Sequence, residues 1–151
     1  MKQLRLPRGI STFNAIARPL LRRGLPMGFN RLVTIRGRSS GVPRTTPLAV
    51  IEVGGRRWVW APWGEVQWVR NLRAAGWATI DVRGRQVDVT ATELDPTQRV
   101  GFFRDVLAPL ARSFPFGVWF IRTVDGVDIG DPEKAAVGRP VFELHTRGSA
   151  T

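Results

Sequence analysis

Alternating apolar and polar residues dominate the chain after residue 30, and this periodicity is typical of β-strands with one buried face. Glycine pairs and single glycines interrupt the alternation at short intervals, as in hairpins. Gly54-Gly55 has the composition of a two-residue hairpin turn, and Gly84 marks a second one. We therefore predict strands over residues 31–36, 45–53, 56–62, 78–83, 86–93 and 139–146.

Apolar residues recur at helical spacing in three places. The first helix is expected over residues 10–25, capped by Ser11 or Thr12 and stopped by Pro26 and Gly28. A second is expected over residues 66–75, ended by Gly76, and a third from Asp95 or Thr97 to about residue 112. Hairpins joined by tight turns favour antiparallel pairing, so we expect a mainly β, compact barrel with flanking helices in a single domain.

Charge is the unusual property of the composition. The 151 residues carry 23 Lys and Arg against 12 Asp and Glu, a net charge of +11, and nearly all the cations are arginine. Arginine binds phosphates and carboxylates through two parallel hydrogen bonds. A nucleic acid, a membrane face or a polyanionic small molecule would suit this charge, but no nucleic-acid-binding motif accompanies it and we expect no such partner.

Several kinds of chemistry are excluded or disfavoured by composition. The absence of cysteine excludes disulfides and thiolate ligands, and His145 is the only histidine. We expect no metal site, because the acidic run of Asp125, Asp128, Asp131 and Glu133 lacks a calcium-loop pattern and is interpreted as a solvated connector. No apolar run has membrane-spanning length and no secretory signal is recognised, so the expected location is the cytoplasm.

The segment from Gly37 to Pro47 is the best candidate for chemistry. It lies between two predicted strands and offers two glycines, two guanidinium groups and several hydroxyls. Backbone amides in such a turn form an anion-binding concavity, which Arg38 and Arg44 would complete. The alternative is an ordinary hairpin loop whose polar groups are only solvated, and composition alone does not decide between the two.

Two motifs follow one another at a defined spacing in the sequence. The first is residues 37–48, Gly-Arg-Ser-Ser-Gly-Val-Pro-Arg-Thr-Thr-Pro-Leu. The second is Ala61-Pro62-Trp63-Gly64, followed by Trp68-Val69-Arg70-Asn71-Leu72. Both motifs and their spacing resemble those of the deazaflavin-dependent nitroreductase and quinone reductase family, and residues 139–144 are similar to its closing strand. This resemblance implies a split β-barrel related to flavin-binding barrels, and it implies coenzyme F-420 (F420), a deazaflavin with a phosphate and an oligoglutamate tail.

The resemblance also implies a set of cofactor-binding residues. Arg38, Ser39, Ser40 and Arg44 would hold the phosphate. Thr45, Thr46, Pro47, Leu48 and Ala49 would line the ring edge, and Ala61, Pro62, Trp63, Gly64, Trp68, Val69, Asn71 and Leu72 would close over the other side. Ser39 stands where the family often has a cation, and Val69 stands where it has tyrosine.

The expected reaction is hydride transfer from reduced F420 to a quinone, enone, nitro compound or unsaturated lipid. The cofactor supplies this chemistry, so no catalytic side chain is assigned. We expect an apolar acceptor pocket lined by Phe114, Phe116, Trp119 and Phe120, whereas Trp58 and Trp60 share one face of a strand and are expected in the core.

Other interpretations stay open at this point. The same barrel would suit FMN, or a flavin or lipid carrier without turnover, or a basic nucleic-acid-binding module. We divide the chain into an N-terminal amphipathic helix in residues 1–30, a barrel in residues 31–146 and a disordered tail in residues 147–151. The helix is suited to contact an anionic membrane, which would place the protein on the inner face of the cell membrane, and related barrels suggest a homodimer.

Overall fold

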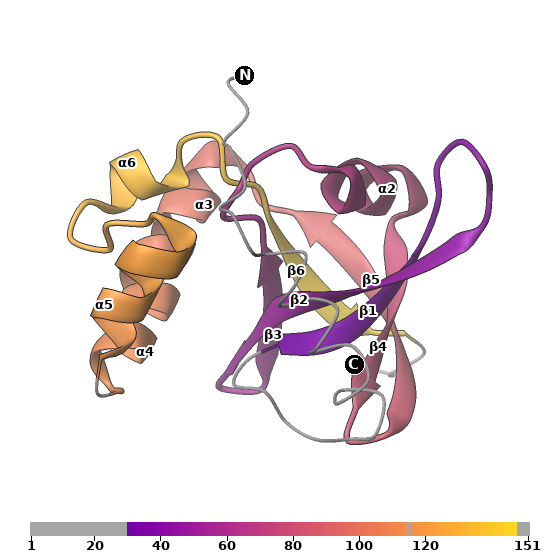
Figure 1. Cartoon of the computed structure of the whole chain (residues 1–151), viewed down its shortest axis with the longest axis horizontal. Coiled ribbons are helices and arrows are strands. Elements are labelled where there is room, and N and C mark those ends of the chain that lie inside the picture. Colours follow the sequence, from indigo (N-terminus) through magenta and orange to yellow (C-terminus); the bar gives the residue numbers. More distant parts are fainter. Residues whose placement is uncertain (1–29, 115, 148–151) are drawn as a thin grey trace.

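Six antiparallel strands form a closed barrel with helices outside it in the computed structural model (Figure 1). The structure describes residues 30–114 and 116–147, without the side chains of Phe120 and Val124. The predicted helix over residues 10–25 and residues 148–151 of the predicted disordered tail lie outside the described residues, so both stay predictions. Arg147, the first residue of that tail, is described, and its amide donates to the Asp88 carbonyl over 2.9 Å. The mainly β, single-domain barrel predicted from the sequence is confirmed.

The barrel is built from hairpins and closed by pairing between distant strands. Its order is β1-β2-β3-β6-β5-β4, and β1 meets β4 through Val33 opposite Ile80. The two-residue turns predicted at Gly54-Gly55 and at Gly84 are confirmed, with positive φ at both residues of each turn. The strands are β1 (Asn30–Arg36), β2 (Pro43–Val53), β3 (Arg56–Trp60), β4 (Trp77–Val82), β5 (Arg85–Glu93) and β6 (Val141–Thr146).

Prolines set two strand ends that the sequence pattern placed differently. The strand predicted to reach Pro62 ends at Trp60, and the strand predicted from Arg139 begins at Val141. Pro62 and Pro140 have no N–H to donate to a ladder, so regular pairing stops beside them. The end of β3 and the start of β6 are joined there by one backbone hydrogen bond, in which the Ala61 amide donates to the Pro140 carbonyl over 2.9 Å.

Helix α2 (Gln67–Ala75) lies over one end of the barrel and packs on β1, β4 and β5 (Figure 1). Its Val69 and Leu72 have no exposed surface and belong to the same apolar cluster as Val33 and Ile80 inside the barrel. The helix ends at Gly76 in a left-handed conformation whose amide donates to the Leu72 carbonyl, as the sequence predicted. The barrel interior is therefore closed by a helix that also carries part of the second motif.

The remaining helices pack on the outer face of β3. They are α3 (Pro96–Phe102), the π-helical turn η1 (Phe103–Leu107), α4 (Ala108–Arg112), α5 (Gly117–Phe120), a second π-helical turn η2 (Ile121–Asp125) and α6 (Pro132–Ala136). Trp58 and Trp60 point outward from β3, as expected from their spacing, and their rings contact Phe102 and Phe103. The structure thus has two apolar cores, one inside the barrel and one between β3 and the helices.

The helical segment that follows α4 was not expected from the sequence. The prediction of a wholly solvated acidic connector is wrong for Asp125, which is partly buried, whereas Asp128, Asp131 and Glu133 are exposed. Asp131 caps α6 by accepting from the Lys134 amide over 3.2 Å, and Asp128 accepts from the Gly130 amide over 2.9 Å. These carboxylates therefore order turns in the chain.

Candidate functional site

The turn between β1 and β2 projects beside α2 at one corner of the molecule (Figure 1). It is closed by two backbone hydrogen bonds, from the Gly37 amide to the Val42 carbonyl and from the Gly41 amide to the Gly37 carbonyl, each 2.9 Å long. Gly37 is buried, and a Cβ there would lie 2.8 Å from Ser40 Oγ and 3.1 Å from the Val42 carbonyl oxygen. The turn therefore requires glycine at this position for reasons of space.

Asn71 joins the two motifs. This side chain is 6 % exposed, and its Oδ1 accepts from the backbone amide of Arg38 over 3.1 Å and from the Arg38 guanidinium over 2.8 Å. Arg38 and Asn71 are far apart in the sequence, and this contact fixes the turn against α2. A burial this complete requires that the amide oxygen be satisfied, and Arg38 supplies both hydrogen bonds.

Polar groups of the turn are left open to an incoming anion. Within the described part of the chain, the backbone amides of Ser39 and Ser40 donate to no acceptor, and Ser39 is exposed. The Ser40 hydroxyl accepts from the Val42 amide over 3.1 Å, so it helps to hold the turn. Two neighbouring free amides in a tight turn form the concavity that binds phosphate oxygens.

Three exposed arginines lie in this turn or at the strand ends beside it, Arg36, Arg38 and Arg44, and a fourth, Arg70, lies on α2 next to Asn71 in the sequence. None of the four forms a salt bridge with a carboxylate of the described residues, whereas Arg56, Arg57, Arg73 and Arg104 each do. The turn is therefore a locally uncompensated cationic surface. Sequence reasoning missed two of these arginines, Arg36 and Arg70. The Arg36 guanidinium lies next to Gly41 of the turn. The strand register and the helix position that place these two residues depend on the fold.

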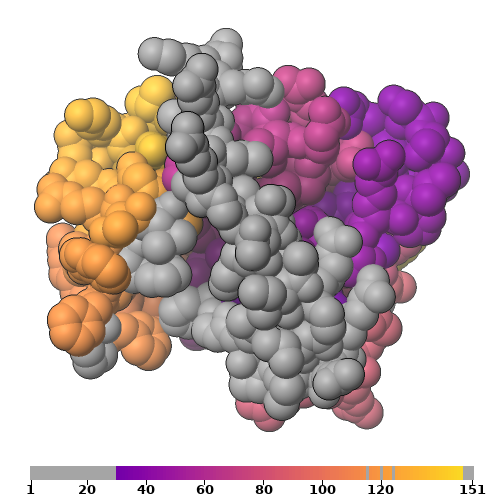
Figure 2. All heavy atoms as spheres, viewed as in Figure 1, coloured from indigo at the N-terminus to yellow at the C-terminus, as the bar shows by residue number. Residues whose placement is uncertain are grey.

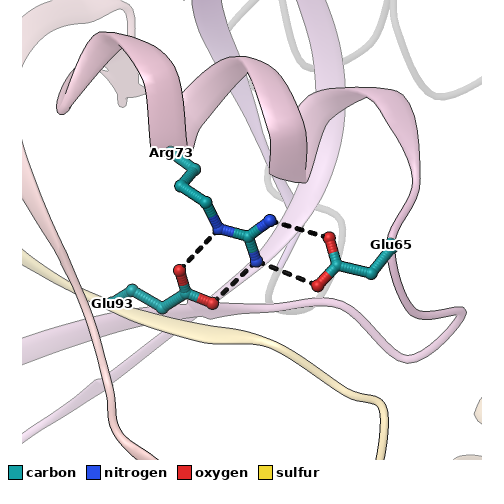
Figure 3. Close-up of polar contacts among 3 residues, drawn as sticks. All are labelled: Glu65, Arg73 and Glu93. Atoms are coloured by element: carbon teal, nitrogen blue, oxygen red, sulfur yellow. Dashed lines mark hydrogen bonds and ion pairs between the residues drawn. The ribbon is translucent and has the colours of Figure 1, made fainter. Parts of the chain in front are cut away.

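A double ion pair holds α2 in place next to the turn. Arg73 donates to Glu65, which precedes the helix, and to Glu93 at the end of β5, with four hydrogen bonds of 2.7–2.9 Å (Figure 3). The hydrogen bonds to Arg73 hold the pKa of Glu65 below its usual range. Because the planar Arg73 guanidinium forms two hydrogen bonds with each carboxylate, this arrangement fixes the direction of the helix as well as its distance.

The loop from Ala61 to Gly64 leads from β3 into α2. Ala61 and Gly64 are buried, while Pro62 and Trp63 are partly exposed. Arg139 anchors this loop, donating over 3.0 Å to the Pro62 carbonyl and over 3.1 and 3.3 Å to the carbonyls of Ala135 and Gly126. Burial raises the pKa of Asp125 to about 6, opposed by the positive charge of Arg139.

The predicted ring-edge residues are divided between two faces of β2. Leu48 faces the barrel interior and packs with Val33 and Val50. Thr45, Pro47 and Ala49 alternate with it and share the outer face, where the Thr45 hydroxyl lies 2.7 Å from that of Thr34. Only one of these sets can present side chains to a single bound ring, because a strand sends successive side chains to opposite faces.

The second motif is divided in the same way. Three of its residues are no more than 1 % exposed and pack into the barrel core: Ala61, Val69 and Leu72. They hold the motif in place but present no surface to a ligand. Trp63 and Trp68 are partly exposed, and the Trp68 ring contacts that of Phe142 at a centroid distance of 6.3 Å. These two tryptophans are the aromatic residues of the motif that a ligand can reach.

The predicted acceptor pocket is not brought to this site. Phe114, Phe116 and Trp119 are exposed around the α4–α5 connection, at the opposite end of the molecule from the β1–β2 turn (Figure 1). The side chain of Phe120 is outside the described part of the structure. The separation has a physical cause, since the helices pack on the outer face of β3 and carry their connection away from the barrel. Among the described residues no group of three or more acidic, histidine or cysteine side chains could hold a metal ion.

The six-strand barrel and the arginine-rich turn define a split-barrel protein with a cationic corner. A family model described as F420H(2)-dependent quinone reductase matches residues 18–114, well over half of the chain. The chain therefore belongs to the F420H(2)-dependent quinone reductase family, which confirms the resemblance seen in the two motifs. No curated protein is similar enough in sequence to count as a match.

Solved structures share the fold at low sequence identity. One described as a domain-swapped dimer is 17% identical, covering 90% of this chain and 98% of that one, with a TM-score of 0.54. An F420-H2 dependent reductase (FDR-A) is 20% identical over 78% of this chain and 94% of its own, with a TM-score of 0.51. A putative 5-nitroimidazole antibiotic resistance protein from Bacteroides thetaiotaomicron is 12% identical, covering 88% of this chain and 78% of its own, with a TM-score of 0.53.

Proposed function

We propose that this chain binds reduced F420 at the β1–β2 corner and transfers its hydride to an organic acceptor such as a quinone, enone, nitro compound or unsaturated lipid. The observation that carries the proposal is the group of exposed arginines that have no carboxylate partner in the described part of the chain, beside two open backbone amides. F420 carries a phosphate and a polyanionic tail, so its chemistry matches this surface. Family membership supports the choice of cofactor over FMN.

Each group at the corner has a defined task in this proposal. The amides of Ser39 and Ser40 bind phosphate oxygens, and the guanidinium groups of Arg38 and Arg44 neutralise their charge. Arg38 is presented rigidly, because Asn71 holds both its backbone and its side chain. Arg36 and Arg70 extend the cationic surface and would meet the carboxylates of the tail.

The reactive ring is assigned to the surface that continues from this corner. Trp63 and Trp68 offer apolar area that excludes water, and the outer face of β2 offers the partly exposed Thr45 and Ala49 on either side of the buried Pro47. When bound, the reduced deazaflavin supplies the hydride, and the chain contributes position and a dry surface. The acceptor must reach this same surface, so we assign the exposed aromatic residues around α5 no part in acceptor binding.

A binding titration with oxidised F420, in which tryptophan fluorescence is the readout, tests the proposal. The pair Arg38→Gln and Arg44→Gln should weaken binding by about tenfold or more for each charge-assisted hydrogen bond that is removed. The matched control is Arg83→Gln with Arg85→Gln, which removes the same charge from the exposed β4–β5 hairpin and should leave affinity nearly unchanged. Equal effects of the two pairs would refute the site, and tighter binding of FMN than of F420 would refute the cofactor.

Turnover tests the reaction separately from binding. With reduced F420 and menadione as acceptor, loss of the reduced cofactor's absorbance should depend on both the protein and the quinone. Binding of F420 without turnover on quinones, enones or nitro compounds would favour a carrier. A homodimer is a second proposal, prompted by the dimeric solved relative, and light scattering on the purified chain tests it.

A further inference from the structure

Large apolar side chains gather at one protruding corner of the molecule, where α4 turns into α5. Phe116 is 81% exposed, Trp119 61%, Phe114 48% and Val118 40%, so four of the most exposed large apolar residues fall within a few positions. The orange atoms of this region form a projecting edge in Figure 2. Soluble proteins rarely group exposed aromatic residues in this way unless the patch has a partner.

The backbone holds these residues outward. Phe116 has a φ of 62°, an uncommon conformation for a residue with a side chain. Gly117 follows it, and a Cβ at Gly117 would meet the Ala111 carbonyl oxygen at 2.2 Å. The connection is therefore a tight turn that only glycine permits, and it fixes the direction of Phe116 away from the helices.

A cationic cavity adjoins the aromatic corner. Its volume is about 170 Å³, and its lining combines two guanidinium groups with apolar side chains. Arg112 has no carboxylate partner among the described residues, and Arg122 has only a long contact of 3.9 Å with Asp128. The lining includes Arg112, Val118, Arg122, Val127, Asp128 and Ile129.

We propose that this α4–α5 corner docks on an anionic lipid bilayer, with Phe116 and Trp119 entering the interface and Arg112 and Arg122 meeting lipid phosphates. Aromatic side chains prefer the boundary between headgroups and acyl chains, and arginine forms paired hydrogen bonds with phosphate. No acidic residue occurs between Asp105 and Asp125, and the net charge of +11 adds long-range attraction.

The shape of the corner favours a bilayer over a second protein. A stable protein–protein interface buries about 1,200–2,000 Å² in total, which usually needs a broad and complementary surface. A narrow projection with four apolar side chains does not offer that, but a bilayer deforms around a projection. This docking surface lies at the opposite end of the molecule from the β1–β2 turn (Figure 1), so its test is independent of the proposed cofactor site.

Sedimentation of the full chain with lipid vesicles tests this proposal. Vesicles of three parts phosphatidylcholine to one part phosphatidylglycerol should bind the protein, and pure phosphatidylcholine should bind it much less. The pair Phe116→Ser and Trp119→Ser should lower the partition coefficient by about tenfold or more. The pair Arg112→Gln and Arg122→Gln should lower it at low salt and make it less sensitive to salt.

Matched controls exclude general effects of charge and polarity. Val53→Ser with Val137→Ser removes exposed apolar groups elsewhere, and Arg83→Gln with Arg85→Gln removes the same charge. Circular dichroism and F420 binding should be unchanged in every variant, which separates lipid docking from folding and from the cofactor site. The proposal is overturned if the wild-type protein binds neither kind of vesicle, or if the corner variants and the controls reduce binding equally. It is also overturned if the corner variants instead convert a dimer to a monomer.

Discussion

At the scale of single residues, Gly37 controls the shape of the proposed phosphate-binding turn. Its missing side chain is the space that Ser40 Oγ and the Val42 carbonyl occupy. Gly37→Ala should therefore displace the turn, lower stability by roughly 1–2 kcal/mol and weaken binding of oxidised F420 by about tenfold or more. Urea unfolding and a fluorescence titration measure the two effects.

Gly101→Ala is the control for that substitution. Gly101 lies in α3, and the nearest atoms to an added Cβ are 4.0 Å away. Alanine there should leave F420 affinity unchanged and stabilise the protein by up to about 1 kcal/mol, because it favours the helix. If Gly37→Ala bound F420 as tightly as Gly101→Ala did, the turn would have no part in the cofactor site.

Asp125 should make stability depend on pH. Burial raises its pKa to about 6 in the folded protein from an ordinary value near 4. Between these two values the folded state holds more protons than the unfolded state, so stability falls as the pH rises through this window and levels off above it. The total change is of order 3 kcal/mol at most.

Asp125→Asn should remove this contribution. The difference in unfolding free energy between the variant and the wild type should grow in the variant's favour from pH 4 to pH 7, as urea unfolding at both pH values would measure. Comparing differences matters, because the pKa values of Glu65 and Glu143 are lowered by Arg73 and Arg56, and these groups give the opposite slope. A difference that does not change with pH would contradict the assignment.

Sequence reasoning identified Arg38 and Asn71 but not the relation between them. Both belong to recognisable motifs, and each was assigned a direct contact with the cofactor. Their hydrogen bonds arise only when α2 closes the barrel end beside β1, and such an interaction leaves no periodic signal in the chain. The same limit applies to Arg139, whose three carbonyl partners come from three separate segments.

At the scale of elements, Arg73 links α2, the loop before it and β5. Arg73→Gln leaves Glu65 and Glu93 partly buried without their cation, and it should destabilise the protein by about 1–2 kcal/mol after allowing for the solvent exposure of Arg73. Arg73→Lys keeps the charge but removes the fork, so an intermediate value is expected. Thermal or urea unfolding measures the series.

The control for Arg73 is a surface ion pair of similar geometry. Arg104 donates to its neighbour Asp105 over 2.9 Å, and both side chains are 62% exposed. Arg104→Gln should therefore change stability very little. A destabilisation as large as that of Arg73→Gln would mean that exposed charge, and not the double fork, sets the effect.

The elements that were predicted well have strong local signals. Helix α2 has helical spacing and a terminal glycine, and the hairpins have glycine turns. The helices between residues 117 and 136 were missed because each is about one turn long, too short to show a period. They are ordered by packing: Val127, Ile129, Ala135 and Ala136 join the outer core, and none of this is visible in local sequence.

At the scale of the whole molecule, the barrel class followed from the sequence, but the strand pairs that close the barrel did not. Hairpin pairs are adjacent in the chain, whereas closure needs β1 against β4 and β3 against β6. No membrane-spanning helix is found among the described residues. The position of the exposed aromatic residues is likewise a property of the assembled molecule, since it depends on the helices packing outside the barrel.

The two apolar cores share strands and should unfold together. On β3, Val59 points into the barrel while Trp58 and Trp60 point toward the helices, and β6 divides Val141 and Phe142 in the same way. Disrupting either core therefore removes support from the strands that build the other. We expect a single cooperative transition in urea, with tryptophan fluorescence and far-ultraviolet circular dichroism coinciding.

A matched pair of substitutions tests this coupling. Leu72 lies in the barrel core and Leu107 in the outer core, and both are at most 2% exposed. Leu72→Ala and Leu107→Ala should each cost about 2–5 kcal/mol, and each should move the whole transition to lower urea with its slope unchanged. If the cores were independent, Leu107→Ala would instead produce an early change in the fluorescence of Trp58 and Trp60. This change would come first because the packing of the helices around these tryptophans would be disrupted first. The circular dichroism of the barrel would keep its midpoint.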